Sequence, residues 1–512
     1  MILVGELCLW IALLMAAWSA TVSFAGGALG RRDLAASGRR ALYVAFAALL
    51  VATAGVIVAL VQRDFSLAYV ALHTNLALPA PYAVTALWSG PAGSMLLWAL
   101  CLAGAAVVLA PAGAARDRTR GPWSAGVSAT LLLFVLLVVC LQANPYERLA
   151  WHLGDGQGLD PRLQVPAMVL QRPLVLLGYA ALMVPIALTL GGLLARRLDA
   201  GWAASARRWA LAGWALLGAG VLLAAREAGA ASPAGGWAWT AGDLVALGVW
   251  GAATALLHTL AIAPRRGLLV KWNSLLSATV ALGALAGGYL MAAGAGAAAI
   301  LEPGRAVSPL AWVGGGVVLA AAAAYLTAAR TAASRVAPGA PAPPRRAGGR
   351  LAHAAAVLLA VALAGRAFAS THEVTLTTGQ DARLADPFGH VWRFVSQGVS
   401  RYGTDDHDVH AVSLEVSRDG AARGLLAATR LQYRDAQGDS VFAPVAPPVV
   451  RRSPLLDTRA VLEGTSGDRA VVRVTFVPLA VWVWIAGALL VFGAVVALWP
   501  GLTPRDGAGT PA

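Results

Sequence analysis

The sequence predicts an all-α polytopic membrane protein of about 11 transmembrane helices, with a small β-rich extracytoplasmic domain before the last helix. Hydrophobic residues make up 58% of the 512 residues, and charged residues make up 12%. A soluble domain normally carries about twice that charged fraction. Several segments run for about 18 or more residues without a charge, which is long enough to cross a bilayer. These spans are expected to be helices, because a helix satisfies its own backbone hydrogen bonds in lipid.

The apolar segments and the stretches between them divide the chain into five parts. Residues 1–330 form the transmembrane core, 331–350 a cytoplasmic linker rich in Pro, Ala and Gly, and 351–369 one further helix. Residues 370–476 alternate apolar and polar positions between turn signals, which predicts short strands. Residues 477–512 supply the last helix and a cytoplasmic tail. The expected helices lie near 3–27, 41–62, 90–112, 122–143, 173–195, 207–225, 243–263, 273–294, 309–329, 351–369 and 478–500.

Arginines gather in alternate connections, and this asymmetry sets the expected orientation. The net charge is +14, and the basic clusters follow the first, third, fifth, seventh and ninth expected helices. Loops rich in Lys and Arg stay in the cytoplasm. We therefore expect the N-terminus and residues 370–476 outside and the C-terminus inside. No basic run is interleaved with aromatic residues, so the charge indicates membrane topology and lipid contact rather than nucleic-acid binding.

Two histidines fall inside apolar segments on different expected helices. His258 lies in TALLHTLAIA, and His353 lies in LAHAAAVLLAVALAG. The orientation places both in the cytoplasmic half of the membrane. Ionisable residues within a bilayer are costly and commonly functional. Two imidazoles at similar depth predict either an iron held between them, as in a membrane haem, or separate hydrogen bonds to neighbouring helices.

Long motifs along the chain carry a family resemblance. Trp88–Leu100 reads WSGPAGSMLLWAL, Asn144–Leu149 reads NPYERL, and the segments GLDPRLQVPAMVLQRPLVLLGY, TALLHTLA and RRGLLVKWNSLL follow in order. Most of the chain resembles the CcmF family of bacterial cytochrome c maturation proteins. That family writes the first motif as W-G-x-x-x-G-S-x-L-L-W, so Ser89 stands here in place of its first glycine. The final segment FVPLAVWVWIAGALL is similar to the family's last helix.

The resemblance implies a cofactor, partners and a location. The family holds a b-type haem (heme b) between two transmembrane histidines, which correspond by position to His258 and His353. It acts in the bacterial inner membrane, receives haem from a haem chaperone, and works with thiol-handling subunits that present apocytochrome c. These properties are implied by the resemblance and not by composition or spacing.

The chain departs from the family pattern at the expected outer face. Two family histidines there correspond to Gln171 and Ile300, and neither side chain is an iron ligand comparable to imidazole. About four helices also appear to be missing between the second of these positions and His353. These losses favour a divergent, shortened member of the family.

The family's tryptophan-rich segment is reduced to GGWAWTAGDLVALGVW. Trp237, Trp239 and Trp250 remain, and they either stack on a flat macrocycle or anchor the helix at the membrane interface. The family's later glutamate in this segment appears as Asp243. Arg172, beside the replaced histidine, either pairs with a haem propionate or extends from a helix end toward water.

Other histidines offer weaker candidates. His73 and His152 lie in expected outer loops, where they either substitute as iron ligands or are simply solvated. His407 and His410 lie in the run DDHDVH, which has metal-binding residue types but is interpreted as a polar loop.

Two functions follow. The first is a CcmF-like membrane protein that binds b-type haem and assists haem reduction and attachment to apocytochrome c, with haem lyase-type activity if the family chemistry is retained. The alternative is a non-catalytic haem-binding or structural subunit that acts with another haem-handling protein. A transporter is disfavoured, because no paired broken helices or buried carboxylates stand out.

Overall fold

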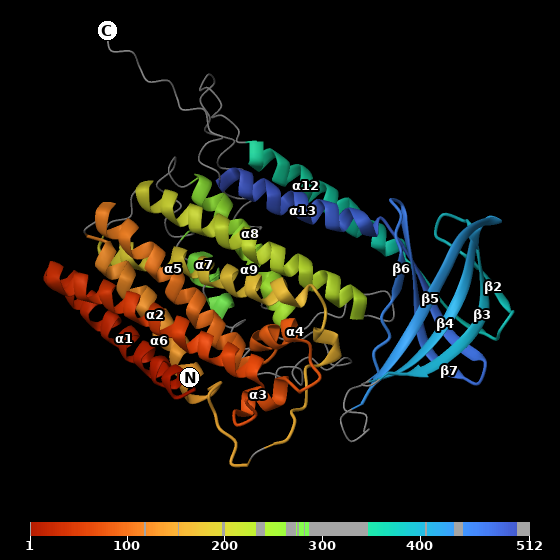
Figure 1. Ribbon diagram of the computed structural model, residues 1–512. Helices are drawn as coiled ribbons and strands as arrows, with labels where there is room; N and C mark the ends of the chain where they lie inside the picture. The colour runs from red at the N-terminus through yellow and green to blue at the C-terminus, as the bar shows by residue number, and fades with distance from the viewer. Residues whose placement is uncertain are drawn as a thin grey trace, which may run out of the picture.

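The computed structural model describes most of the chain. The described residues are 2–116, 119–151, 153–196, 200–231, 241–262, 273, 276–280, 282–285, 347–404, 407–434 and 444–498. Long helices form one bundle, and a sandwich of two sheets lies at one end of it (Figure 1).

The bundle is built from long, mainly apolar helices. A helix that is apolar on all sides must be buried in protein or lipid. The helices are α1 (Ile2–Leu29), α2 (Arg32–Gln62), α5 (Pro91–Arg116), α6 (Gly121–Leu141), α7 (Met168–Leu194), α8 (Ala200–Ala231), α9 (Ala241–Ile262), α12 (Ala347–Gly365) and α13 (Ala480–Leu498).

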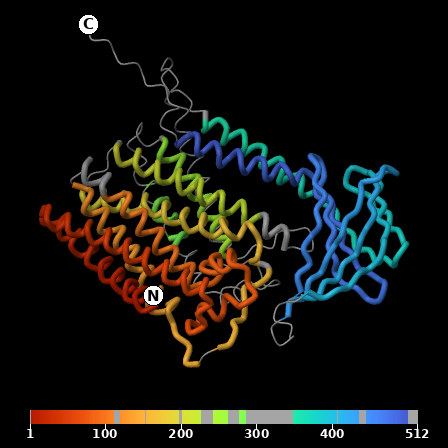
Figure 2. The backbone as a smooth tube through the Cα atoms, viewed as in Figure 1, coloured from red at the N-terminus to blue at the C-terminus, as the bar shows by residue number. Residues whose placement is uncertain are grey.

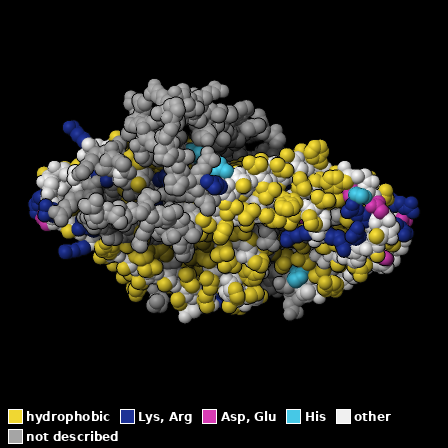
Figure 3. Space-filling view, turned by 90° about the horizontal axis from the view of Figure 1, so that it is seen from above, with side chains coloured by type: hydrophobic (Ala, Val, Ile, Leu, Met, Phe, Trp, Pro, Cys, Tyr) yellow, Lys and Arg dark blue, Asp and Glu magenta, His cyan; other side chains and the backbone are white. Residues whose placement is uncertain are grey.

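All nine of these helices contain a stretch long and apolar enough to cross a membrane, counted over the described residues only. Leu276–Leu285 is a shorter apolar helix that includes a position outside those residues. Hydrophobic side chains cover the middle of the molecule, and basic side chains gather toward its two ends (Figure 3). This distribution matches a protein that spans a bilayer with its ends in water.

Short helices close the bundle at the end near the sandwich. They are α3 (Ala68–His73), α4 (Ala80–Thr85), η1 (Ala86–Trp88) and η2 (Pro161–Leu163). The N-terminus of α1 lies at this end as well (Figure 1). Leu67 pairs with Arg148 in an isolated β-bridge, which ties the two connections together.

The sandwich follows α12 through the short helix η5 (Arg366–Phe368). One antiparallel sheet has the order β1-β8-β7-β6 and the other β2-β3-β4-β5. The strands are β1 (Ser370–Leu376), β2 (Asp381–Ala385), β3 (Val391–Gly403), β4 (His407–Arg418), β5 (Ala421–Tyr433), β6 (Val449–Arg451), β7 (Leu456–Ser466) and β8 (Arg469–Pro478).

Alternation of side chains along the strands produces the sandwich core. Successive strand residues point to opposite faces, so Val472, Val474 and Phe476 of β8 all face inward and are fully buried. Phe394 of β3 is also fully buried, and the Trp392 ring lies 5.6 Å from the Phe476 ring. The two sheets therefore share one apolar layer.

A helical hairpin joins the sandwich to the bundle. α12 enters the sandwich and α13 leaves it, and the two helices run side by side along the bundle (Figure 2). α13 packs on α8, which in turn packs on α7 and α9.

The fold class predicted from the sequence is confirmed: the chain is largely helical, and its strands lie before the last helix. Four helix starts were placed too late. α8 begins at Ala200 rather than near 207. α2 begins at Arg32 rather than near 41, because its arginines extend the helix beyond the apolar stretch. α7 begins at Met168 and includes Pro173, and α12 begins at Ala347, inside the expected linker. The helix expected near 309–329 lies outside the described residues.

The buried Phe476 ring gives a test of the sandwich. We expect Phe476→Ala to lower the free energy of unfolding of the sandwich by about 3–5 kcal/mol, because it leaves a cavity between the sheets. Pulse proteolysis of the full chain in detergent across a urea series would measure the change. Phe388→Ala is the control, since that ring is 54% exposed. Equal urea midpoints for the two variants would contradict this packing.

Candidate functional site

The imidazoles of His258 and His353 lie next to each other, although α9 and α12 are far apart in the sequence. Their ring centres are 5.9 Å apart and their planes are inclined by 85°. His258 lies in the last two turns of α9 and is half-buried, and His353 lies in the second turn of α12 and is exposed. The two predicted candidates are therefore neighbours at the end of the bundle opposite the sandwich.

Both imidazoles are oriented by their own helices. Nδ1 of His258 lies 2.7 Å from the Thr254 carbonyl oxygen, and Nδ1 of His353 lies 2.6 Å from the Gly349 carbonyl oxygen. A carbonyl oxygen only accepts, so each Nδ1–H donates and the ring lone pair lies on Nε2. Metal-binding histidines are commonly held in this way, with the second ring nitrogen donating to a carbonyl.

The donor set fits a single iron. An imidazole nitrogen lies about 2 Å from a first-row metal ion, so two ring centres on opposite sides of one ion are roughly 6 Å apart. The observed 5.9 Å agrees with that separation. Neutral imidazole is a usual ligand of haem iron.

Close packing of small residues fixes the position of α12. A side chain at Gly348 would lie 2.4 Å from the Gly493 carbonyl oxygen of α13, so the two backbones are in contact there. A side chain at Gly487 of α13 would in turn collide with Leu222 of α8. Such small residues let membrane helices approach closely. α9 and α12 are not themselves closely packed among the described residues, so His353 is positioned through α13 and α8.

Trp250 has a packing partner one helix away. Its ring stacks on Trp214 of α8 at 5.0 Å, and its Nε1–H donates to the Trp214 carbonyl oxygen at 3.2 Å. Trp214 in turn donates to the Thr254 hydroxyl at 2.7 Å, one helical turn before His258. A haem-stacking role for Trp250 stays a prediction. Trp237 and Trp239 lie outside the described residues.

Arg172 lies in a second polar cluster, between α5 and α7. Its Nη1 donates to the Ser94 hydroxyl at 3.4 Å, and Ser94 donates to the Trp88 carbonyl oxygen at 3.0 Å. The nearest charge that acts on Arg172 is Asp243 at the start of α9. Because Asp243 begins α9 and His258 ends it, this cluster is separate from the imidazole pair.

His73 borders the second cluster. Its ring stacks on Tyr69 at 4.2 Å, and its Nδ1–H donates to the Tyr69 carbonyl oxygen at 2.8 Å. A side chain at Gly90 would lie 2.2 Å from His73 Nε2, so the imidazole rests against this glycine. The Tyr69 hydroxyl donates toward the Leu87 carbonyl oxygen at 2.7 Å. His73 is thus held in a short helix and not in an open loop.

The glycine-rich motif found in the sequence has a direct structural reason. A side chain at Gly93 would lie 1.8 Å from the Leu87 carbonyl oxygen and 2.5 Å from the Tyr69 hydroxyl. No other residue fits where the start of α5 folds back on η1. The motif therefore brings Tyr69, Ser94 and Arg172 together.

The remaining sequence candidates are not gathered at either cluster. Gln171 is partly buried on α7, while Ile300 and His152 lie outside the described residues. In the run DDHDVH, His407 to His410 belong to β4 and not to a polar loop, and the two preceding aspartates lie outside the described residues. His410 bonds the Thr465 hydroxyl and Asp408 pairs with Arg434. Within the described ranges, no three His, Cys, Asp or Glu side chains gather as a metal site.

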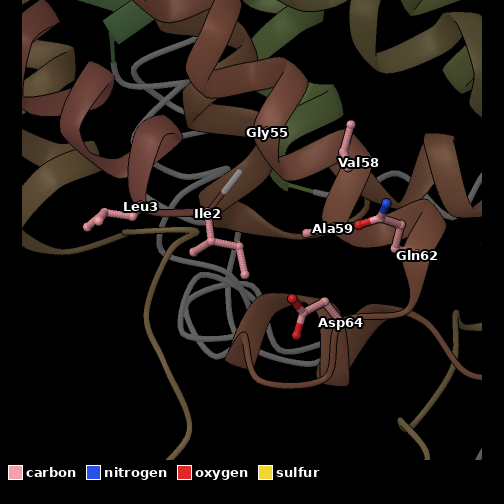
Figure 4. Close-up of a pocket in the computed structure, with 7 residues that line it drawn as sticks. All are labelled: Ile2, Leu3, Gly55, Val58, Ala59, Gln62 and Asp64. Carbon is pink, nitrogen blue, oxygen red and sulfur yellow. The ribbon is translucent and has the colours of Figure 1, made fainter.

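A pocket of about 260 Å³ lies at the N-terminal end of α1, away from both clusters (Figure 4). Its Asp64 carboxylate already accepts the Ser66 hydroxyl at 2.6 Å. The pocket lining joins the start of α1 to the end of α2: Ile2, Leu3, Gly55, Val58, Ala59, Gln62 and Asp64.

Comparison with known proteins agrees with this architecture. The family model "Cytochrome C assembly protein" matches residues 88–286. A solved structure titled "Cytochrome c Heme Lyase CcmF" superposes with a TM-score of 0.74 at 20% identity, covering 98% of each chain. That solved chain therefore holds no large block of helices that this chain lacks. The chain therefore has the fold of that solved structure, with a cytochrome c assembly segment at residues 88–286.

Curated relatives match part of the chain. The chain is 32% identical over 292 residues to the "Cytochrome c-type biogenesis protein CcmF" of Pseudomonas aeruginosa, which covers 57% of this chain and 44% of that protein. It is 34% identical over 250 residues to the "Probable cytochrome c-type biogenesis protein NrfE" of Escherichia coli, covering 49% and 45%. Over about half of its length the chain is therefore similar to CcmF-type cytochrome c biogenesis proteins. It spans less than half the length of these curated relatives.

Sequence reasoning missed three residues of the second cluster, namely Tyr69, Ser94 and Trp98. Trp98 lies one turn after Ser94 on α5, and its fully buried indole faces Tyr179 of α7 at 6.4 Å. The family motif around Gly93 and Ser94 could have pointed to this cluster, because a glycine there indicates that two backbone segments lie very close together. The motif does not show which residues of other helices, such as Tyr69 and Arg172, contact that segment.

His73 gives a pH-dependent test. Burial lowers its pKa below the ordinary value of 6.5. Above pH 6.5 the His73 imidazole is neutral in both the folded and the unfolded state. As the pH falls below that value, the unfolded state binds a proton before the folded state does, so the free energy of unfolding decreases. The decrease ends once the pH is below the pKa of His73 in the folded state.

We expect the melting temperature of the wild type to fall between about pH 7 and pH 5, and His73→Gln to show a shallower fall. Thermal melts of the detergent-solubilised chain across this range would measure the difference. Parallel curves for the two proteins would show that His73 titrates alike in both states.

Proposed function

We propose that this chain binds b-type haem between His258 and His353 and assists haem reduction and attachment in cytochrome c maturation. The observation that carries the proposal is the imidazole pair, whose ring centres lie 5.9 Å apart with both Nδ1 atoms on backbone carbonyls. Similarity to CcmF-type proteins supports the choice of haem over another metal group.

Each histidine has a defined role in this proposal. Donation from Nδ1 to the carbonyl of the preceding turn fixes the tautomer and leaves Nε2 to bind iron. The same bond restricts ring rotation, so little conformational entropy is lost on binding. When bound, the haem would supply one-electron redox chemistry, with a potential tuned by its axial ligands.

Lipid exposure explains why the site is built from neutral side chains. Charged ligands are costly inside a bilayer, whereas two neutral imidazoles with satisfied Nδ1–H groups add no charge.

The proposed topology places this site in the cytoplasmic half of the bacterial inner membrane, with the sandwich outside. The arginine clusters in the sequence and the position of His353 near the start of α12, opposite the sandwich, support this orientation. The proposed partners are a haem chaperone and the thiol-handling subunits that present apocytochrome c. These partners follow from the family's role in cytochrome c maturation.

A second function is favoured by one residue. Gln171 occupies the position where the family resemblance leads us to expect an outer histidine, and an amide is a poor iron ligand beside imidazole. The chain would then hold b-type haem without haem lyase activity and act beside another haem-handling protein. Complementation of a strain that lacks its own CcmF separates the two: restored cytochrome c supports the lyase, and its absence with haem b retained supports the subunit.

Replacement of either histidine tests the site. We expect the reduced-minus-oxidised absorption of purified wild type to show a b-type haem, and His258→Ala or His353→Ala to lose most of it, because one axial ligand is gone. His407→Ala in the sandwich is the matched control and is expected to keep full absorbance. A colourless wild type from haem-replete cells would refute the proposal.

A positional variant separates ligation from mere folding. Gly493→Leu forces α13 away from Gly348 and shifts His353 without altering either histidine. We expect this variant to remain folded and to bind substantially less haem. Retention of the full haem content would show that the α12–α13 contact does not set the imidazole spacing.

A further inference from the structure

A short turn of the sandwich rests on the start of α13. Residues 452–455 form this turn, between β6 and β7. The Trp482 indole Nε1–H donates to the Pro454 carbonyl oxygen at 2.8 Å. The Leu479 N–H, directly before α13, donates to the Leu455 carbonyl oxygen at 2.9 Å. The start of β7 therefore lies at the level where α13 begins, beside the end of α12 (Figure 1).

This turn lies at the edge of the apolar helix segments. Gly348–Phe368 and Ala480–Leu498 are each long and apolar enough to cross a membrane, and the first ends where the second begins. Phe368 and Leu455 are exposed at this edge, and Trp482 is partly exposed. Aromatic side chains are typical of the level where lipid headgroups meet hydrocarbon. The turn therefore lies at headgroup depth.

Three arginines, the junction arginines, converge on this edge. Arg366 directly follows α12, Arg452 begins the turn and Arg459 lies on β7. The charge of Arg459 acts on Arg366, and the charge of Arg452 acts on Arg459. Asp457 is the acidic group that acts on Arg459 within the described part of the chain. Three cations and one anion leave an excess of positive charge there.

Strand alternation turns this charge away from the sandwich core. Asp457 and Arg459 lie on the face of β7 opposite to Ala460, which is part of the buried core. Arg459 is paired with Thr475 of β8, and Thr475 is paired with Thr371 of β1. The two threonine hydroxyls are 3.3 Å apart, and Thr371 is exposed. A guanidinium and hydroxyl groups thus share the outer surface of the sheet.

The charge of Arg459 is only partly compensated. Burial lowers the pKa of its guanidinium, because partial removal from water disfavours the charged form. The Asp457 carboxylate opposes this effect, but the same carboxylate also accepts the Ser453 N–H at 3.3 Å and interacts with Arg452. A phosphate group accepts two parallel hydrogen bonds from a guanidinium. An oxyanion of this kind would balance the remaining charge.

An apolar surface on α12 leads to the junction arginines. Val357 and Val361 are one turn apart on this helix and are both exposed, as is Phe368 just after it. An exposed apolar surface on a membrane-length helix contacts lipid rather than water. The positive charge is therefore next to a surface that suits acyl chains.

We propose that Arg366, Arg452 and Arg459 bind the phosphate group of a bilayer phospholipid whose acyl chains lie along α12. A lipid is favoured over a soluble anion or an acidic protein segment, because basic groups and exposed apolar side chains meet at one edge and such pockets bind lipid headgroups. The excess positive charge favours an anionic headgroup over a zwitterionic one. This inference goes beyond the proposed function, since the imidazole pair contributes nothing to it.

Native mass spectrometry of the full chain in detergent would measure the affinity of the first bound lipid. Dioleoylphosphatidylglycerol is the probe, because it carries one phosphate and a net negative charge. We expect Arg459→Gln to raise its dissociation constant about fivefold, the usual contribution of one basic residue beside an anionic lipid surface. Arg459→Lys keeps the charge but not the paired hydrogen bonds and is expected to fall between the two.

Two further variants guard against an effect of folding. Arg452 is exposed, so Arg452→Gln leaves the packing intact and is also expected to weaken binding about fivefold. Arg469→Gln is the matched control, because this exposed arginine lies on β8 six residues from Thr475, which is about 20 Å along the strand. Equal dissociation constants for Arg452→Gln, Arg459→Gln and wild type would overturn the proposal.

The wild type alone separates a lipid from other anions. Dioleoylglycerol, which lacks the phosphate, is expected to bind at least about tenfold more weakly than the phosphatidylglycerol. Equal affinity of the two would contradict a phosphate site. Inorganic phosphate and polyglutamate, at the concentration of the lipid, are expected not to displace it. Displacement by either one would assign the junction arginines to a soluble anion or an acidic protein segment, and would overturn a lipid site.

Discussion

The position of His353 depends on one close contact, between Gly348 of α12 and Gly493 of α13. That contact lets α13 lie between α12 and α8, and α8 carries α9. His353 therefore reaches His258 through three packed interfaces rather than through direct packing of their own helices. Small residues make such approaches possible in membranes, so the contact between Gly348 and Gly493, beside the Gly349 carbonyl that orients His353, sets the spacing of the two imidazoles.

Polar groups inside the bundle form hydrogen bonds in two separate regions. At the imidazole pair each Nδ1–H donates to a carbonyl oxygen of the preceding helical turn. Around Arg172 the guanidinium donates to the Ser94 hydroxyl, which in turn donates to the Trp88 carbonyl oxygen. The two polar regions are separate, because Asp243, whose charge acts on Arg172, begins α9 and His258 lies near its end.

The sequence predicted membrane-length helices, a β-rich region before the last helix and two histidines within apolar segments, because hydropathy and strand alternation are local patterns. The arrangement of the strands as two sheets was not predicted. The contacts of Arg172 with Ser94 and of Trp250 with Trp214 were not predictable, since they join helices distant in the chain. His407 to His410 were assigned to a loop, because the pairing of β4 with β3 and β5 that makes them a strand is a long-range property. The arginines of α2 were assigned to a connection for the same reason.

Electron paramagnetic resonance of the oxidised, detergent-purified wild type tests the central claim most directly. Two imidazoles on one ferric haem give a low-spin iron, whereas a single axial ligand leaves it high-spin. We predict a low-spin haem signal that becomes high-spin or disappears in His353→Ala. A wild-type haem that is high-spin, or a low-spin signal unchanged in that variant, would contradict an iron shared by His258 and His353.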